Sequence, residues 1–213
     1  MENVIENALE FVKNFFKNDS SGHDYFHTYR VFNMAKHLAE NEKADNRIVM
    51  LAALLHDVDD IKISPDTHQN KDNARNFLIN NNIDSKTIEL ICHVISEISY
   101  KGNESSSPST LEAKIVQDAD RLDAIGAIGV ARAFSFGGSR NRTMHDPNEL
   151  PCLNMNEQEY RNHISTTVNH FYEKLFNLTN LMNTQTAKTI AIKREKYMKD
   201  FLDEFYAEWD GKK

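Results

Sequence analysis

Apolar positions recur along this chain at the three- and four-residue spacing of helices. In the first segment, Ile5, Leu9, Val12 and Phe16 follow one another at intervals of four, three and four residues. An α-helix has about 3.6 residues per turn, so positions at this spacing share one face. The same pattern recurs in seven further segments, at about residues 25–38, 46–57, 71–81, 84–98, 111–134, 156–178 and 184–209. No alternating stretch indicates a strand, and the pattern predicts an all-α protein.

Polar residues mark where these helices begin and where loops separate them. Asp24 and Asp84 each precede a helical segment, and either Asp45 or Asn46 opens another, as the short polar side chains of helix caps do. The longest irregular stretch is FGGSRNRTMHDPNELP, residues 136–151. An irregular segment of this length inside a helical protein is often functional, and we expect a lid or a substrate loop.

Composition limits the class of protein. With 213 residues and 24.5 kDa, the chain can bury one sizeable core, and we expect a single domain over residues 1–213. The net charge of -7 carries no basic tail, which argues against nucleic acid or an anionic membrane as a partner. No signal peptide and no run of eighteen apolar residues is apparent, so a cytoplasmic protein is expected. Cys92 and Cys152 match no metal or redox spacing and are expected to be reduced.

Several polar residues stand where apolar ones are expected. His27 begins the apolar stripe of the second helix, and the run LAALL leads directly into His56 and Asp57 near the end of the third. The helix EAKIVQDADRLDAIG adds three carboxylates: Asp118, Asp120 and Asp123. A single buried histidine is usually an ordinary core residue, but two histidines and two carboxylates are costly to bury without a shared cation. Imidazole and carboxylate ligands together favour a divalent ion of the Mn, Fe, Co or Ni kind.

Periodicity does not decide which aspartate of that helix would join the ion. Asp118 lies off the face defined by Val116 and Ala119. Asp120 lies four residues after Val116, and Asp123 lies four residues after Ala119, so both are compatible with the apolar face.

The order of these residues carries a resemblance to a known family. His27, then the pair His56 and Asp57, then a distant aspartate resembles the H…HD…D signature of the HD superfamily of metal-dependent phosphohydrolases. The surrounding segments HDYFHTYRVFNMA, ALLHDVDDIK, ISYKG, QDADRLDAIGAIGVAR and FSFGG, with a basic loop and HDP, resemble the small bacterial HD-domain hydrolases that act on nucleotides. The resemblance runs from about residue 20 to the terminal EW.

This resemblance implies a compact HD-domain helical bundle with a metal-binding core at about residues 20–135 and carboxyl-terminal helices, 156–210, packed on it. It implies one bound divalent metal, Mn2+, Co2+, Ni2+ or Fe2+ with Mg2+ also possible, held by His27, His56 and Asp57. The family places its last ligand in the A-D-R-L portion, which selects Asp120. Asp123 would then support the site or hold a water, and it is the alternative ligand.

Further residues are expected to bind substrate or move protons. Asp60 is the candidate for proton transfer, and Lys62 the nearest candidate for contact with a phosphate. Arg121, Arg140 and Arg142 could neutralise phosphate oxygens, and Lys101 of the ISYKG motif is a further candidate. Arg30 is expected to bond a carboxylate behind the ligands, and His93 is an alternative extra ligand or a residue lining the site. Asp59 receives no role.

The expected function is hydrolysis of nucleoside or deoxynucleoside phosphates, with release of phosphate or pyrophosphate. A cyclic-nucleotide phosphodiesterase is one alternative, and a metal- or nucleotide-binding regulatory module without turnover is another. The expected partner is a small phosphorylated molecule. The chain could act as a monomer or a homodimer, since the aromatic last helix could pack in the core or against a second subunit.

Overall fold

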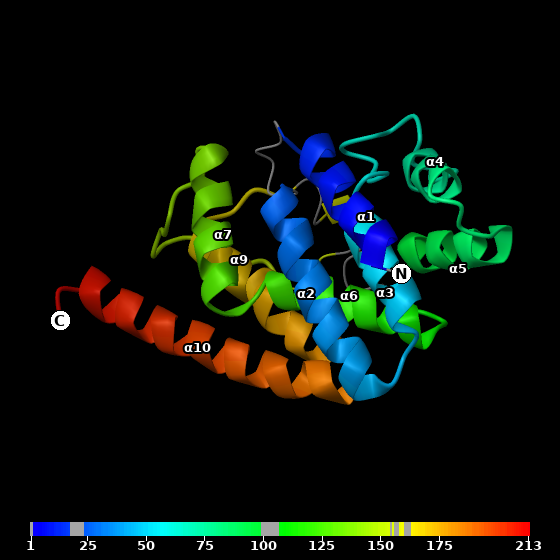
Figure 1. Ribbon diagram of the computed structural model, residues 1–213. Coiled ribbons are helices and arrows are strands. Elements are labelled where there is room, and N and C mark those ends of the chain that lie inside the picture. Colours follow the sequence, from blue (N-terminus) through cyan, green and yellow to red (C-terminus); the bar gives the residue numbers. More distant parts are fainter. Residues whose placement is uncertain (1, 18–23, 99–106, 154, 156–157, 160–162) are drawn as a thin grey trace. The chain divides into compact units, whose positions relative to one another are not determined.

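The computed structural model describes residues 2–17, 24–98, 107–153, 155, 158–159 and 163–213 (Figure 1). These residues form helices and no strand, so the all-α prediction is confirmed. No helix in these ranges is both long and apolar enough to cross a membrane. The helices are α1 Glu2–Phe15, α2 Tyr25–Glu42, α3 Asn46–Leu55, α4 Asp72–Asn80, α5 Ser85–Ser96, α6 Leu111–Asp123, α7 Gly126–Ser139, α9 Thr167–Glu173, the 3-10 helix η2 Leu175–Leu181 and α10 Gln185–Trp209.

Contacts divide the chain into two compact units. Unit 1 comprises Met1–Tyr100 and Ser106–Asp120, and unit 2 comprises Lys101–Ser105 and Arg121–Lys213. The division falls inside α6, after Asp120. The single domain expected from the sequence stays a prediction.

Unit 1 is built around α3. Leu51, Ala52, Ala53, Leu54 and Leu55 are all fully buried, and the helix packs against α1, α2 and α5. Figure 1 shows α3 behind α1 and α2. A helix that is apolar all round belongs in a core, because no face of it favours water. The residues that follow Leu55 therefore start from a rigidly held helix end.

The outer helices of unit 1 bury one face each. The buried residues are Val4, Ala8 and Val12 in α1 and Phe16 just after it, whereas Ile5 and Leu9 are only half-buried. The apolar pattern predicted this helix at the right residues. The first part of its buried face lies one residue earlier in the chain than the pattern predicted. Ala8 is fully buried, and hydropathy alone underrates such a small residue.

Side-chain caps begin three helices of this unit where the sequence predicts them. The Asp24 carboxylate accepts from His27 N–H at 2.7 Å, and Asp84 accepts from Thr87 N–H at 3.0 Å. Asp45, rather than Asn46, caps α3 by accepting from Arg47 N–H at 2.9 Å and Ile48 N–H at 3.2 Å. These bonds satisfy amide groups that a helix leaves without partners at its amino end.

Unit 2 is held together by α10, which packs against α7 and η2, while α7 and η2 both contact α9. Its core is aromatic. Phe134 of α7 has its ring centroid 5.9 Å from that of Phe201 and 6.1 Å from those of Phe171 and Phe205. Aromatic pairs at this distance add to the stability gained by burying their area. The aromatic last helix thus contributes to a core, although Trp209 at its end remains 48% exposed.

The predicted helix 111–134 is instead two helices. Ile125 is extended, with φ -127° and ψ 166°, and Gly126 has φ +77°. That positive φ favours glycine, and a Cβ there would lie 2.9 Å from Cγ of Arg194. The second helix, α7, then continues through the FGG sequence to Ser139, so the break predicted at residue 136 comes four residues later, at Arg140.

The predicted helix 156–178 is interrupted. Residues 158–159 are helical, but residues 163–166 are not, and α9 begins only at Thr167. Residues 156–157 and 160–162 lie outside the described residues. The physical reason is a competing set of polar bonds: Thr166 caps α9, and Ser165 Oγ donates to the buried Glu173 carboxylate at 2.7 Å. These side chains hold the preceding segment extended.

Candidate metal centre

Three side chains of unit 1 converge on one point. His27 comes from α2, while His56 and Asp57 follow the carboxyl end of α3. Asp57 Oδ2 lies 3.4 Å from His27 Nε2 and 3.2 Å from His56 Nε2. All three residues are buried, and they form the one group of potential ligands found among the described residues. Ligand atoms about 2.1 Å from an ion and at right angles to it lie about 3.0 Å apart, so the cluster is close to a binding geometry.

The backbone sets the orientation of His56. Its Nδ1 lies 2.8 Å from the carbonyl oxygen of Ala53. A carbonyl only accepts, so Nδ1 must carry the hydrogen, and in the neutral ring Nε2 then presents a lone pair. Nε2 is buried and makes no well-directed hydrogen bond. Metal-ligating histidines characteristically have their other ring nitrogen bonded in this way.

Electrostatics show that the cluster favours added positive charge. Burial lowers the pKa of His56, but the adjacent Asp57 carboxylate, with a smaller contribution from Asp120, outweighs burial and raises that pKa to about 9. Without an ion, a proton on His56 supplies the positive charge. A divalent cation would balance the Asp57 and Asp120 carboxylates while both imidazoles stay neutral, so these residues fit such an ion.

The two aspartates that periodicity left open have different surroundings. Asp120 Oδ1 lies 3.4 Å from His27 Nε2, beside the cluster, and its side chain is 34% exposed. Asp123 belongs to unit 2, where its Oδ2 forms an ion pair with Arg132 at 2.5 Å. Asp120 therefore lies next to His27, and its role as fourth ligand stays a prediction. Asp118, predicted to lie off the apolar face, is fully buried, because α6 is buried all round from Ile115 to Ala119.

Asp60 and Lys62 lie in the turn that follows the ligands. Asp60 N–H donates to the carbonyl oxygen of Asp57 at 3.0 Å, and Asp60 Oδ1 accepts from Lys62 N–H at 2.9 Å. Asp60 is half-buried, and Lys62 is exposed. One carboxylate oxygen of Asp60 thus shapes the turn close to the ligands.

Two further predicted residues, Arg121 in unit 2 and His93 in unit 1, have partners within their own units. Arg121 is buried and donates to the carbonyl oxygen of Leu181. His93 is exposed, with Nε2 3.0 Å from Ser109 Oγ and 3.5 Å from Glu97 Oε2.

The remaining basic candidates stay predictions. In unit 2, Arg140 and Arg142 lie over the Phe136 ring at 5.4 and 5.6 Å from its centroid. Arg30 is half-buried on α2. Lys101 lies outside the described residues.

Two residues with defined partners escaped the sequence reasoning. Arg132 is the ion-pair partner of Asp123, and no local spacing signals it because the two lie nine residues apart across a helix break. Asp59, which received no role, is only 1% exposed and accepts two backbone hydrogen bonds from the start of α4. A signal existed in the sequence: α4 has Lys71, not a capping residue, at its amino end.

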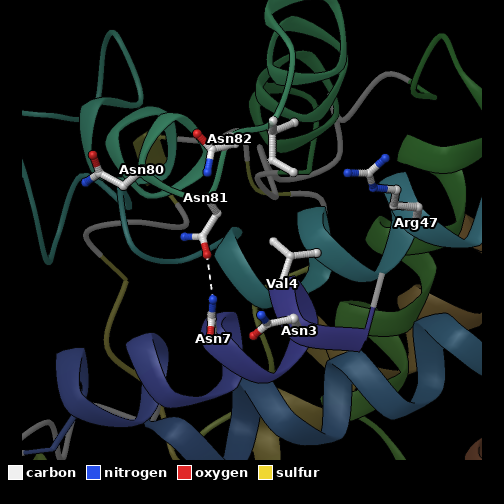
Figure 2. A pocket seen from close by; sticks show the side chains of 8 residues that line it. Asn3, Val4, Asn7, Arg47, Asn80, Asn81 and Asn82 are labelled. Atoms are coloured by element: carbon white, nitrogen blue, oxygen red, sulfur yellow. Dashed lines mark hydrogen bonds between the residues drawn. The ribbon is translucent and has the colours of Figure 1, made fainter.

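Unit 1 also has a polar surface hollow of about 480 Å³ (Figure 2). It is lined mainly by amides, and Asn7 Nδ2 on α1 donates to Asn81 Oδ1 at 2.7 Å across it. Its lining residues are Asn3, Val4, Asn7, Arg47, Asn80, Asn81, Asn82 and Ile83. None of them belongs to the His and Asp cluster, so this hollow is separate from the metal-binding residues.

Comparisons with known proteins identify the family. Residues 24–125, which include the whole cluster, match the HD domain. A crystal structure of a protein from Lactobacillus plantarum is 38% identical, with 99% of each chain covered and a TM-score of 0.84. An HD-superfamily hydrolase from Bacillus thuringiensis is 37% identical, with 98% of each chain covered and a TM-score of 0.79. YpgQ of Bacillus subtilis, whose structure was solved in complex with ADP, is 32% identical over 96% of this chain and 97% of that one, with a TM-score of 0.77. The chain therefore belongs to the HD superfamily and is a metal-dependent phosphohydrolase.

Proposed function

We propose that this phosphohydrolase acts on nucleotides at a single divalent ion held by His27, His56, Asp57 and Asp120. The observation that carries the proposal is the convergence of these four side chains in unit 1, with 3.2 to 3.4 Å between neighbouring ligand atoms. The ion belongs to the Mn, Fe, Co and Ni group, because two imidazoles favour transition metals over Mg2+.

Each ligand contributes differently. His56 is oriented by its bond to Ala53, and its Nε2 is the atom that would hold the ion. Asp57 is buried between the two imidazoles and fixes their spacing. Asp120, beside His27, has the most exposed side chain of the four and would supply a second carboxylate to the ion. A divalent ion at such a site lowers the pKa of a bound water and polarises a phosphoryl oxygen.

Asp60 and Lys62 provide the remaining chemistry within unit 1. Asp60 uses Oδ1 to hold the turn, and we assign its carboxylate the role of accepting the proton from the attacking water. Lys62 is exposed one turn beyond the ligands and can neutralise a phosphate oxygen. A chain with net charge -7 needs such local positive charge to bind a polyanion.

A nucleotide is the substrate class best supported by the relatives. YpgQ, a similar protein over nearly its whole length, has been crystallised with ADP. A nucleoside diphosphate combines an anhydride bond, which water at a metal site can attack, with a base and sugar that give specificity. The reaction proposed for this chain is release of phosphate or pyrophosphate from a nucleoside or deoxynucleoside phosphate.

The test is a panel of nucleoside mono-, di- and triphosphates and cyclic nucleotides, assayed with Mn2+, Co2+, Ni2+ and Mg2+. Wild type should release phosphate or pyrophosphate with at least one transition metal, and Asp57→Asn should not. Activity confined to cyclic nucleotides would replace the proposal with a phosphodiesterase. Metal binding without turnover on any substrate would instead indicate a binding module.

A matched pair of variants tests the fourth ligand. Asp120→Asn should weaken Mn2+ binding, because it removes a carboxylate beside His27. Asp123→Asn makes the same chemical change on the same helix but breaks the ion pair with Arg132 instead. Equal loss of Mn2+ affinity in the two variants would contradict the assignment of Asp120.

A further inference from the structure

The turn that carries the metal ligands is bonded to a segment far along the chain. Asp59, two residues after Asp57, is 1% exposed. Its Oδ1 accepts from Asn73 N–H at 3.1 Å, and its Oδ2 accepts from Ala74 N–H at 3.0 Å. Both oxygens of a buried carboxylate are therefore used by the backbone. Asp59 is turned toward α4 and does not belong to the ligand cluster.

Helix α4 depends on this carboxylate. The residue at its cap position, Lys71, has φ +59° and forms no side-chain cap. The first amides of a helix need acceptors, and its amino end also attracts negative charge. Asp59, which lies 14 residues before Asn73 in the chain, supplies the acceptor oxygens and the negative charge. It therefore caps α4 although it is not adjacent to this helix in the sequence.

Two more hydrogen bonds join the same segments. Asn73 Nδ2 donates to the carbonyl oxygen of Val58 at 2.9 Å, and His68 Nδ1 donates to the carbonyl oxygen of Asp59 at 2.8 Å. The residues immediately after the ligand pair thus accept four hydrogen bonds from residues 68–74. The local bond that Val58 N–H donates to the carbonyl oxygen of Leu55 is longer, at 3.4 Å.

We propose that Asp59 is a positioning residue for the metal centre: through α4 it fixes the backbone that presents His56 and Asp57. This inference rests on the metal site of the proposed function but not on the identity of the substrate. The core helix α3 holds this backbone from one side, and the bonds to residues 68–74 hold it from the other. A ligand set is precise only if both flanks of the backbone are fixed, because small displacements weaken coordination.

Asp59→Asn tests this with a minimal change of shape. The amide keeps one acceptor but turns an NH2 group toward a backbone N–H, so one of the two bonds is lost. Asp84→Ala is the matched control, since it removes an ordinary side-chain cap from the neighbouring helix α5. Isothermal titration with Mn2+ should show about tenfold or greater loss of affinity in Asp59→Asn. Asp84→Ala, whose cap is local to α5, should change Mn2+ affinity less than about twofold.

Hydrogen exchange measured by mass spectrometry gives a readout that needs no metal. In the metal-free Asp59→Asn variant, amide exchange should be faster than in wild type in two segments: residues 56–60 and the start of α4. In Asp84→Ala, exchange should be faster in α5 alone. If Asp59→Asn does not fold, Asn73→Ala is the milder variant. It removes the bond to Val58 and one to Thr67 Oγ1 but leaves both bonds of the Asp59 carboxylate, and it should weaken Mn2+ binding by a smaller factor.

The outcomes separate this inference from the proposed function. Unchanged Mn2+ affinity in Asp59→Asn or Asn73→Ala, with wild type binding normally, would overturn the positioning role alone. Normal Mn2+ binding by wild type without turnover of any nucleotide would overturn the proposed function alone. Wild type that binds no metal would contradict both.

Discussion

A proton should compete with the metal ion for the cluster. Next to Asp57 and Asp120, metal-free His56 has its pKa raised to about 9, although burial alone would lower it. A metal ligand must offer a neutral Nε2, so binding of an ion below pH 9 must expel this proton. Metal affinity should therefore rise with pH up to about 9 and then level off, because fewer His56 side chains carry the competing proton at higher pH.

The raised pKa sets the size of the effect. When one proton must leave, apparent affinity changes about tenfold per pH unit below the pKa of the group. Between pH 7 and pH 9, apparent Mn2+ affinity should therefore rise about 50-fold, which corresponds to about 2.3 kcal/mol, because half of His56 is still protonated at pH 9. An unperturbed histidine would give almost no change in this interval, because it is already neutral at pH 7.5.

The assay is isothermal titration of EDTA-treated protein with Mn2+ at several pH values between 7 and 9. At pH 7, titrations in two buffers of different ionisation enthalpy should show release of about one proton per ion. The variant His37→Gln, which removes an exposed histidine of α2, should leave the pH dependence unchanged. An affinity that does not vary between pH 7 and pH 9 would refute the reasoning, since His56 would then already be neutral.

Three further predictions concern stability. Glu173→Ala should lower the free energy of unfolding by about 3 kcal/mol, because three donors bonded to its buried carboxylate lose their acceptor. Urea denaturation measures this loss. Glu173→Gln should lose less, because its amide keeps one acceptor oxygen. Leu55→Ala, at a fully buried position of α3, should cost about 2 to 5 kcal/mol, and a cost below that of the exposed Leu90→Ala would contradict the core assignment. Burial, with Lys174 and Arg142 nearby, lowers the pKa of His170 from 6.5 to about 3, so its contribution is intact above pH 6.5 and is lost as pH falls toward 3. The drop in stability between pH 7 and pH 5 should be up to about 2 kcal/mol larger in wild type than in His170→Gln, and equal drops would show that His170 titrates normally.

Local patterns predicted most of the helices because their causes are local. The caps at Asp24, Asp45 and Asp84 depend on residues only two or three positions apart, and the structure shows their hydrogen bonds. The apolar run from Leu51 to Leu55 predicted a core helix, and every residue of it is buried.

The predictions that failed involve partners distant in the chain. The break after Asp123 arises where Arg194 packs against Gly126, 68 positions earlier in the chain, leaving no room for a side chain. The extended segment before α9 is held by Glu173, which bonds both His163 and Ser165. Helical periodicity contains no information about either contact.

In the candidate site, too, some features could be predicted from the sequence and others depend on the fold. Periodicity alone was enough to predict the all-α class, and the H…HD…D order pointed to the family and to the residue types that suit a divalent ion. Only the tertiary structure distinguished the surroundings of Asp120, beside His27, from those of Asp123, paired with Arg132. It also gave Asp59 a partner, at the start of α4. The reason is physical: helix formation is governed by neighbours a few residues apart, whereas the partner of a buried carboxylate is whichever donor the folded chain brings to it.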